Sequence, residues 1–313
     1  MQNIARNIMH ELRWIYFSKM IWVILVCVIT FSTWSIFQQY QYWETMRTYY
    51  EHSLAVAEEN GQNILAMLQS DLGISTMPDG TKNIENTLRY DYLNLAAAES
   101  QISFSGGSSQ GLGFSCFIFL APLFLAVGLA VGRHDLRSNA IALRSMNNGN
   151  KDKVLFGKII TIFIMSVTIP LLIAFLSGSG AKVLGSFIDF SIIDPINFTQ
   201  PYKNFPKLLI SAILISFIYG ALGLVLGLFF KKIWILFSFL VLMFFILPIT
   251  GTFDPRNIMA VLIVSHVTII GFFQPSTLGD ITTTFSALFW VCTVSLILTS
   301  AWYRWNLMDK RVA

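Results

Sequence analysis

Long apolar runs separated by short polar segments dominate the pattern of this chain. Six of the runs contain no Asp, Glu, Lys or Arg, and they predict transmembrane helices at 20–37, 113–132, 159–176, 208–230, 233–249 and 285–302. An α-helix needs about 20 predominantly apolar residues to cross the hydrocarbon layer of a bilayer. We therefore predict an all-α integral membrane protein with six transmembrane helices.

A further apolar stretch at 257–273 is ambiguous. Gly251 and Pro255 precede it, and a Gln-Pro-Ser break at 274–276 follows it. These breaks predict a re-entrant helical hairpin at 255–280 that enters and leaves on the outer side. Irregular backbone is tolerated at membrane depth where it is buried in protein or lines a cavity. The alternative is a short seventh span.

Three segments outside the runs have patterns of their own. Residues 1–19 place apolar residues at helical spacing among charged ones, which predicts an amphipathic interfacial helix; the alternative is a basic flank that only orients the first span. Residues 38–112 are acidic and rich in helix formers, which predicts an extracellular helical insertion. Its Gly/Ser-rich end at 103–113 predicts a flexible return. The proline-containing loop at 177–207 has room only for short helices.

Composition supports the membrane assignment. The chain is 55% hydrophobic and 12% charged, with a mean hydropathy of +0.63, whereas a soluble domain has about 25% charged residues. This composition argues against a soluble enzyme. All three cysteines lie within apolar runs, so we interpret them as small hydrophobic residues and not as disulfide partners.

The distribution of charge predicts the orientation. With the N-terminus inside, the inner segments hold 14 of the 21 basic residues and a net charge of +10, and the outer segments have a net charge of −6. Inner loops of membrane proteins carry an excess of Lys and Arg. Both termini, including the tail 303–313, are therefore predicted to be cytoplasmic, in the cell membrane. An even number of crossings follows, which disfavours the seventh span.

Motifs for catalysis are missing from the sequence. It contains no Gly-rich phosphate loop, no metal-ligand spacing and no Ser-His-Asp set. We therefore expect no catalytic site, bound metal, cofactor or nucleic-acid partner, and we interpret His266 as a structural residue. Ion-coupled transporters usually keep ionisable residues within the membrane. The predicted spans hold none, so energy for any transport has to come from another subunit.

The inner loop at 133–158 carries a recognisable pattern. An acidic position, a short apolar helix, a basic position and a Gly-Lys pair at the start of the next span follow one another at Asp135, Leu143, Lys151 and Gly157-Lys158. This order resembles the loop between the second and third spans of ABC-2 type (type V fold) ABC transporter permeases. Asn139-Ala140 stand where that family usually has Gly-Thr, and Asn148-Gly149 replace its Pro-containing turn.

The resemblance implies an exporter permease subunit without its own ATPase site. Cytoplasmic ABC ATPase subunits would bind ATP and Mg²⁺, and a second permease subunit, identical or homologous, would complete the transporter within the membrane lipid. A loop helix at about 136–147 would dock on the ATPase. The residues implied in this coupling are Asp135, Arg137, Asn139, Leu143, Arg144 and Lys151. The alternative is a basic loop that only contacts lipid headgroups.

The substrate is constrained only by polarity. A path between uncharged, aromatic-rich helices favours an amphiphile, such as a hydrophobic peptide, a lipid-like compound or an antibiotic, and the sequence identifies no residues along that path. Export of such a compound would confer antibiotic resistance or release a peptide. The alternative function is a non-transporting membrane scaffold or sensor subunit whose ectodomain binds a ligand.

Overall fold

The computed structural model describes residues 2–76, 82–137, 152–188, 204–230, 237, 251–267 and 281–309. These residues are helical almost throughout, apart from one two-stranded sheet. The elements in chain order are α1 (Gln2–Phe17), α2 (Met20–Glu59), α3 (Ile64–Gln69), β1 (Ile74–Thr76), β2 (Lys82–Ile84), α4 (Thr87–Gln101), α5 (Phe104–Ile118), α6 (Leu120–Arg137), α8 (Asp152–Gly185), α9 (Phe205–Phe229), α11 (Pro255–Val264) and α12 (Thr283–Asp309).

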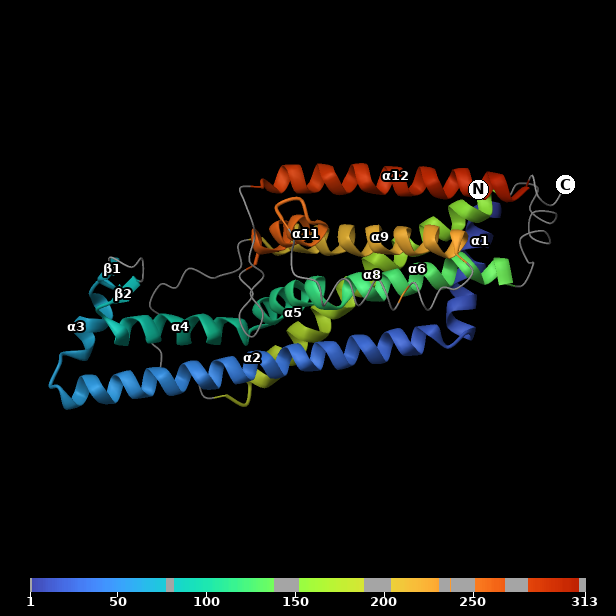
Figure 1. Ribbon diagram of the computed structural model, residues 1–313. Coiled ribbons are helices and arrows are strands. Elements are labelled where there is room, and N and C mark those ends of the chain that lie inside the picture. Colours follow the sequence, from blue (N-terminus) through green and yellow to red (C-terminus); the bar gives the residue numbers. More distant parts are fainter. Residues whose placement is uncertain are drawn as a thin grey trace.

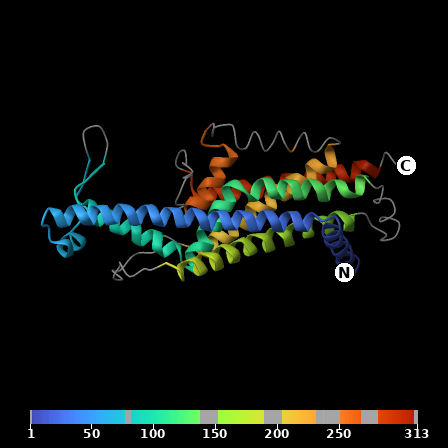
Figure 2. The ribbon, with the colours of Figure 1, turned by 90° about the horizontal axis from the view of Figure 1, so that it is seen from below.

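The long helices run side by side as an elongated bundle (Figure 1). At one end of this bundle α2 continues outward with α4, and these two helices carry α3 and the two strands. Helix α1 lies across the opposite end, at an angle to the long helices (Figure 2). The C-terminal ends of α6, α9 and α12 lie at the same end as α1 (Figure 1). The side of a membrane that this end faces stays a prediction from charge.

Helix α2 is longer than the span predicted at 20–37. It runs without a break over 40 residues, from Met20 to Glu59, which corresponds to a length of about 60 Å, whereas the hydrocarbon layer is about 30 Å thick. The apolar run ends near Phe37, but the helix does not, because good helix formers follow it. Its first half is apolar on the exposed side, for example at Trp22 and Val26, as expected of a surface that faces lipid.

The second half of α2 builds a projecting unit, which we define as residues 38–102. Helix α4 packs along α2 around a separate core formed by Trp43, Tyr50, Tyr92 and other apolar residues. Asn86 begins α4 by accepting a hydrogen bond from the backbone N–H of Arg89 at 3.1 Å. These residues are mostly helical, as predicted, and the outer position of the insertion stays a prediction. The antiparallel pairing of β1 with β2 at its tip was not predicted.

The Gly/Ser-rich segment at 103–113 was predicted to be flexible, and this prediction is wrong. Ser103 accepts a hydrogen bond from the Gly106 N–H at 3.0 Å, and helix α5 follows directly, with Gly106 to Gly113 all buried. The reason is tertiary: small residues let α5 approach α8 at backbone distance, so that a side chain at Gly107 would overlap Ala181 and the carbonyl of Ser177. Between membrane helices, glycine promotes packing more than it promotes flexibility.

The predicted span at 113–132 is not one straight helix. Helices α5 and α6 meet at Phe119 with a bend of 60°. Pro122 explains the break, because it has no N–H for the carbonyl of Ile118 and its ring would clash with that carbonyl in a continuous helix. In the first turn of a new helix the proline is tolerated, since the N–H groups there have no partner within the helix.

Among the described residues, four helices are long and apolar enough to cross a membrane, namely α2, α8, α9 and α12, or five spans if the bent α5–α6 pair counts as one. This confirms a helical membrane protein with several spans. The predicted fifth span at 233–249 lies outside the described residues, except for Phe237, and the total of six stays a prediction. Helix α8 extends beyond its predicted bounds, 159–176, at both ends, so residues 177–185 are helical and do not form a loop.

Helix α11 bears on the ambiguous stretch at 257–273. It ends at Val264 after 10 residues, a length of about 15 Å, which is too short to cross the hydrocarbon layer. Asp254 begins it by accepting a hydrogen bond from the Arg256 N–H at 2.9 Å, and its residues from Asn257 to Ile263 are buried. Residues 268–280 lie outside the described part, so the re-entrant hairpin stays a prediction.

Glycines bring α6 and α9 into backbone contact. A side chain at Gly128 would overlap the carbonyl of Gly220, and one at Gly223 would overlap the carbonyl of Leu125. Gly132 and Gly227 continue the same contact one turn further along. These glycines therefore serve packing within the chain.

A carboxyl group is half-buried in the core of the projecting unit. Burial raises the pKa of Glu99 to about 7, although the Trp43 indole and the Arg47 guanidinium partly offset this rise. The Arg47 guanidinium also lies 5.4 Å from the centroid of the Trp43 ring. The charge of Glu99 therefore changes near neutral pH.

The α6–α9 contact predicts a strong effect of adding one methyl group. We expect Gly128→Ala to lower the free energy of unfolding by about 1–3 kcal/mol, because the new Cβ has no space. The measurement is thermal unfolding of the full chain in mild detergent. Gly251→Ala is the matched control, since a Cβ at Gly251 meets no atom within 4 Å. Equal stability of the two variants would contradict the close packing.

The raised pKa of Glu99 predicts that the projecting unit loses stability as the pH rises. The pKa is higher in the folded state than in an unfolded chain, so the folded state binds more protons between about pH 4.5 and pH 7. Stability is then fully present below this window and falls as the pH rises through it. We expect Glu99→Gln to flatten the pH dependence of the melting temperature. The exposed Glu44 on α2 provides the control substitution, Glu44→Gln, which should leave the slope unchanged.

Candidate functional site

The most unusual polar cluster lies where α1 crosses the end of the bundle. Helix α1 buries one face, formed by Asn7, Glu11 and Ile15 at spacings of four residues, with exposed fractions of 3%, 0% and 2%. Its apolar residues Met9 and Phe17 point outward and are exposed. The predicted amphipathic helix is present, but a polar residue and a charged residue lie on the side that faces the protein.

A buried ion pair fastens α1 to α8. The Nζ atom of Lys158 lies 3.2 Å from Oε1 of Glu11, and the two side chains are 0% and 1% exposed. Lys158 also donates a hydrogen bond of 2.8 Å to the backbone carbonyl of Val131 in α6. One ammonium group therefore holds three helices together, and we call this cluster the junction.

The residue before Lys158 allows the close approach. A Cβ atom at Gly157 would lie 2.8 Å from the Cβ atom of Asn7, so α1 and α8 touch here because Gly157 has no side chain. The Gly-Lys pair thus has two separate structural roles. Gly157 provides the space for α1, and Lys158 provides the charge that holds it.

An aromatic contact joins α1 directly to α6. The ring centroids of Trp14 and His134 are 4.2 Å apart, and His10 is 6.4 Å from His134 by the same measure. His134 lies one turn before the end of α6 at Arg137. Helix α1 therefore contacts both helices that lead into the loop at 138–151.

The predicted coupling residues divide into two groups. Asp135 and Arg137 belong to the last turn of α6 and not to a separate loop helix, so residues 133–137 of the predicted loop are a continuation of the span. At the other side, residues 152–158 belong to α8. Charged residues do not end a helix that leaves the membrane, because water solvates them. Asn139, Leu143, Arg144 and Lys151 lie outside the described residues.

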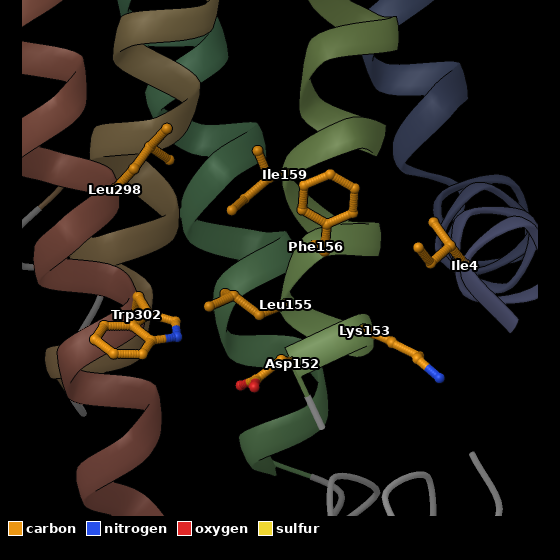
Figure 3. A pocket seen from close by; sticks show the side chains of 8 residues that line it. All are labelled: Ile4, Asp152, Lys153, Leu155, Phe156, Ile159, Leu298 and Trp302. Carbon is orange, nitrogen blue, oxygen red and sulfur yellow. The ribbon is translucent and has the colours of Figure 1, made fainter. Parts of the chain in front are cut away.

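An apolar groove of about 300 Å³ flanks the junction, between α1, α8 and α12. Figure 3 shows Leu298 and Trp302 of α12 on one side of the α8 residues and Ile4 of α1 on the other. The remaining lining residues come from α8 and are Asp152, Lys153, Leu155, Phe156 and Ile159. The two charged residues lie at one end of the groove (Figure 3). The largely apolar lining suits an apolar chain.

Sequence reasoning missed Glu11 and Lys158 as a pair. Each had a local signal: Glu11 is the one acidic residue in the otherwise basic segment 1–19, and Lys158 stands directly at the start of an apolar run. Both were counted as solvated inner charges. Only the crossing of α1 over α8 shows that each charge neutralises the other.

The described residues include no group of three or more His, Cys, Asp or Glu side chains that could hold a metal ion. Within the same part of the chain, Cys27, Cys116 and Cys292 are free thiols. The junction is therefore best understood as a mechanical and electrostatic connection between helices.

Comparison of the chain with protein-family models, with curated protein sequences and with solved structures finds no match. The functional argument therefore rests on the residues themselves.

The ion pair predicts that single and double substitutions behave differently. Glu11→Leu or Lys158→Met alone leaves one buried charge without its partner, which should cost about 3–5 kcal/mol in the free energy of unfolding. The double variant removes both charges and should recover most of that loss. The free energy of unfolding of the full chain in detergent is measured for the original protein, the two single variants and the double variant. If the two single losses simply add in the double variant, the side chains do not interact as described.

Proposed function

We propose that this chain is the transmembrane permease subunit of an ABC exporter, driven by separate cytoplasmic ATPase subunits. The observation that carries the proposal is the anchoring of the inner loop at 138–151. Lys158 binds Glu11 at 3.2 Å and the Val131 carbonyl at 2.8 Å, so the helix before the loop and the helix after it are fastened to the same α1. A force applied to such a loop moves α1, α6 and α8 together.

Continuous helices would carry this movement across the membrane. Helix α8 runs unbroken over 34 residues from Asp152 to Gly185. It packs against α5 and α9 through the bundle and reaches the base of the projecting unit (Figure 1). Rigid-body motion of packed helices is a common way in which membrane and soluble proteins convert a local event into a distant one. The loop end would face the cytoplasm, as the basic residues there suggest.

The scarcity of buried charged side chains in the apolar helices also supports the proposal. Lys158 is neutralised at the end of the bundle, and the described apolar helices hold no other buried charged side chain between their ends. A secondary transporter would need ionisable groups along its path. A partner ATPase avoids that need. The substrate would be an uncharged or amphiphilic compound, and the projecting unit would lie over the exit.

A second candidate, a scaffold or sensor subunit, is favoured by one feature. The projecting unit has its own apolar core around Trp43 and Tyr92, and it is joined to the bundle through the unbroken helix α2. A ligand bound to this unit would act on the bundle through α2. In this alternative, the loop at 138–151 would contact a signalling partner and not an ATPase.

Affinity purification of the tagged chain from its native membranes, followed by an ATP-hydrolysis assay, distinguishes the candidates. We expect an ATPase subunit to co-purify, and Asp135→Ala combined with Arg144→Ala to abolish its recovery, because charge-assisted contacts of the loop would be lost. The control combines Glu44→Ala with Lys182→Ala, two exposed charges away from the loop end of the bundle. Purification of the chain without any nucleotide hydrolysis would favour the sensor.

A further inference from the structure

A line of polar side chains lies inside the apolar part of the bundle. Helix α2 carries Ser32, Ser35 and Gln39 at spacings of three and four residues, and they are 3%, 4% and 6% exposed. This face of α2 leads into the projecting unit and ends there at Gln39, one turn before the core residue Trp43. In the apolar half of a span, such residues are buried only at a cost.

Helices α5 and α8 bring further polar groups to the same place. A side chain at Gly111 of α5 would overlap the hydroxyl of Ser177 in α8, and its Cβ would lie 3.5 Å from the hydroxyl of Ser35 in α2. Ser177 is fully buried. Gly111 of α5 is thus the point at which the hydroxyls of Ser35 in α2 and Ser177 in α8 converge. We call Ser32, Ser35, Gln39, Gly111 and Ser177 the polar seam.

Hydrogen bonds within the protein do not satisfy this seam. The Gln39 amide nitrogen donates to the Ser35 hydroxyl at 3.4 Å. Among the described residues, however, the hydroxyls of Ser32 and Ser177 and the amide oxygen of Gln39 have no hydrogen-bond partner. By contrast, the nearby Ser108 donates to the Ala174 carbonyl at 2.8 Å. A buried hydroxyl without a partner costs about 1–3 kcal/mol, so three such groups together indicate partners that are not part of the described chain.

We propose that the polar seam is a hydrated, uncharged binding site, which holds water and accepts the hydroxyl or amide groups of a solute that displaces this water. Buried polar sites with several hydrogen-bonding groups normally hold ordered water. The seam contains no charged side chain, so it offers no compensation for a charged ligand. Hydroxyls and an amide supply both donors and acceptors. The proposal goes beyond the exporter function and holds whether or not an ATPase drives the chain.

Cysteine reactivity tests the hydration directly. In a full chain with Cys27, Cys116 and Cys292 replaced by Ala, Ser177→Cys is compared with Ile173→Cys. Both positions are 0% exposed and lie one turn apart on α8, but Ile173 belongs to the apolar core. The probe is methyl methanethiosulfonate, which is small and reacts with thiolates, and intact-protein mass spectrometry follows the reaction. Ionisation of a thiol needs water, so we expect the cysteine at position 177 to react at least about tenfold faster. Equal rates would overturn the proposal.

A stability measurement covers the case in which a cysteine variant does not fold. If the seam is dry, Ser177→Ala removes a hydroxyl that lacks a partner, and the melting temperature rises. If the seam is hydrated, the same change removes a hydrogen bond to water, and the melting temperature falls. We expect a fall for Ser177→Ala, whereas an unchanged or higher value contradicts the proposal. Ser108→Ala, which removes a hydrogen bond within the protein, provides the reference loss.

Discussion

In a bilayer, apolar side chains gain little by leaving lipid for another helix, so contact between helices depends on how closely their backbones approach. This constraint explains the arrangement of the bundle. Gly128, Gly223 and Gly227 bring α6 and α9 together at carbonyl distance. Gly107 and Gly178 do the same for α5 and α8. Larger residues at these positions would separate the helices and with them the polar clusters that they position.

The close contacts place two polar clusters at opposite ends of the apolar region. At the α1 end, Glu11 and Lys158 neutralise each other and hold together the helices on either side of residues 138–151. At the other end, Ser32 and Gln39 of α2 and Ser177 of α8 are buried polar residues without charge. The first cluster is held together by an ion pair within the protein and is suited to transmit force. The second lacks internal partners and is suited to receive water or a solute. Helix α8 takes part in both, so a displacement at one end of α8 has a direct path to the other.

The proposed exporter uses this division of roles. The loop at 138–151 would receive the movement of an ATPase, the junction would pass it to α6 and α8, and the projecting unit would stand where the substrate leaves. The sensor alternative uses the same connections in the reverse direction. The difference between the two functions thus lies in the partner and not in the bundle, which is why recovery of an ATPase is the decisive observation.

The sequence by itself determined the class of the protein. Uncharged runs of about 20 residues have few stable conformations other than membrane helices. The helical character of residues 1–19 followed from the spacing of apolar residues, and that of residues 38–59 from their content of helix formers. The tertiary structure alone decided the rest. Gly and Ser at 103–113 form a buried helix because α8 lies against them. Glu11 and Lys158, 147 positions apart, become partners only because α1 crosses α8. The local sequence pattern indicates which conformation each segment prefers in water or lipid. Contacts such as these depend on which distant segment packs against it in the folded chain.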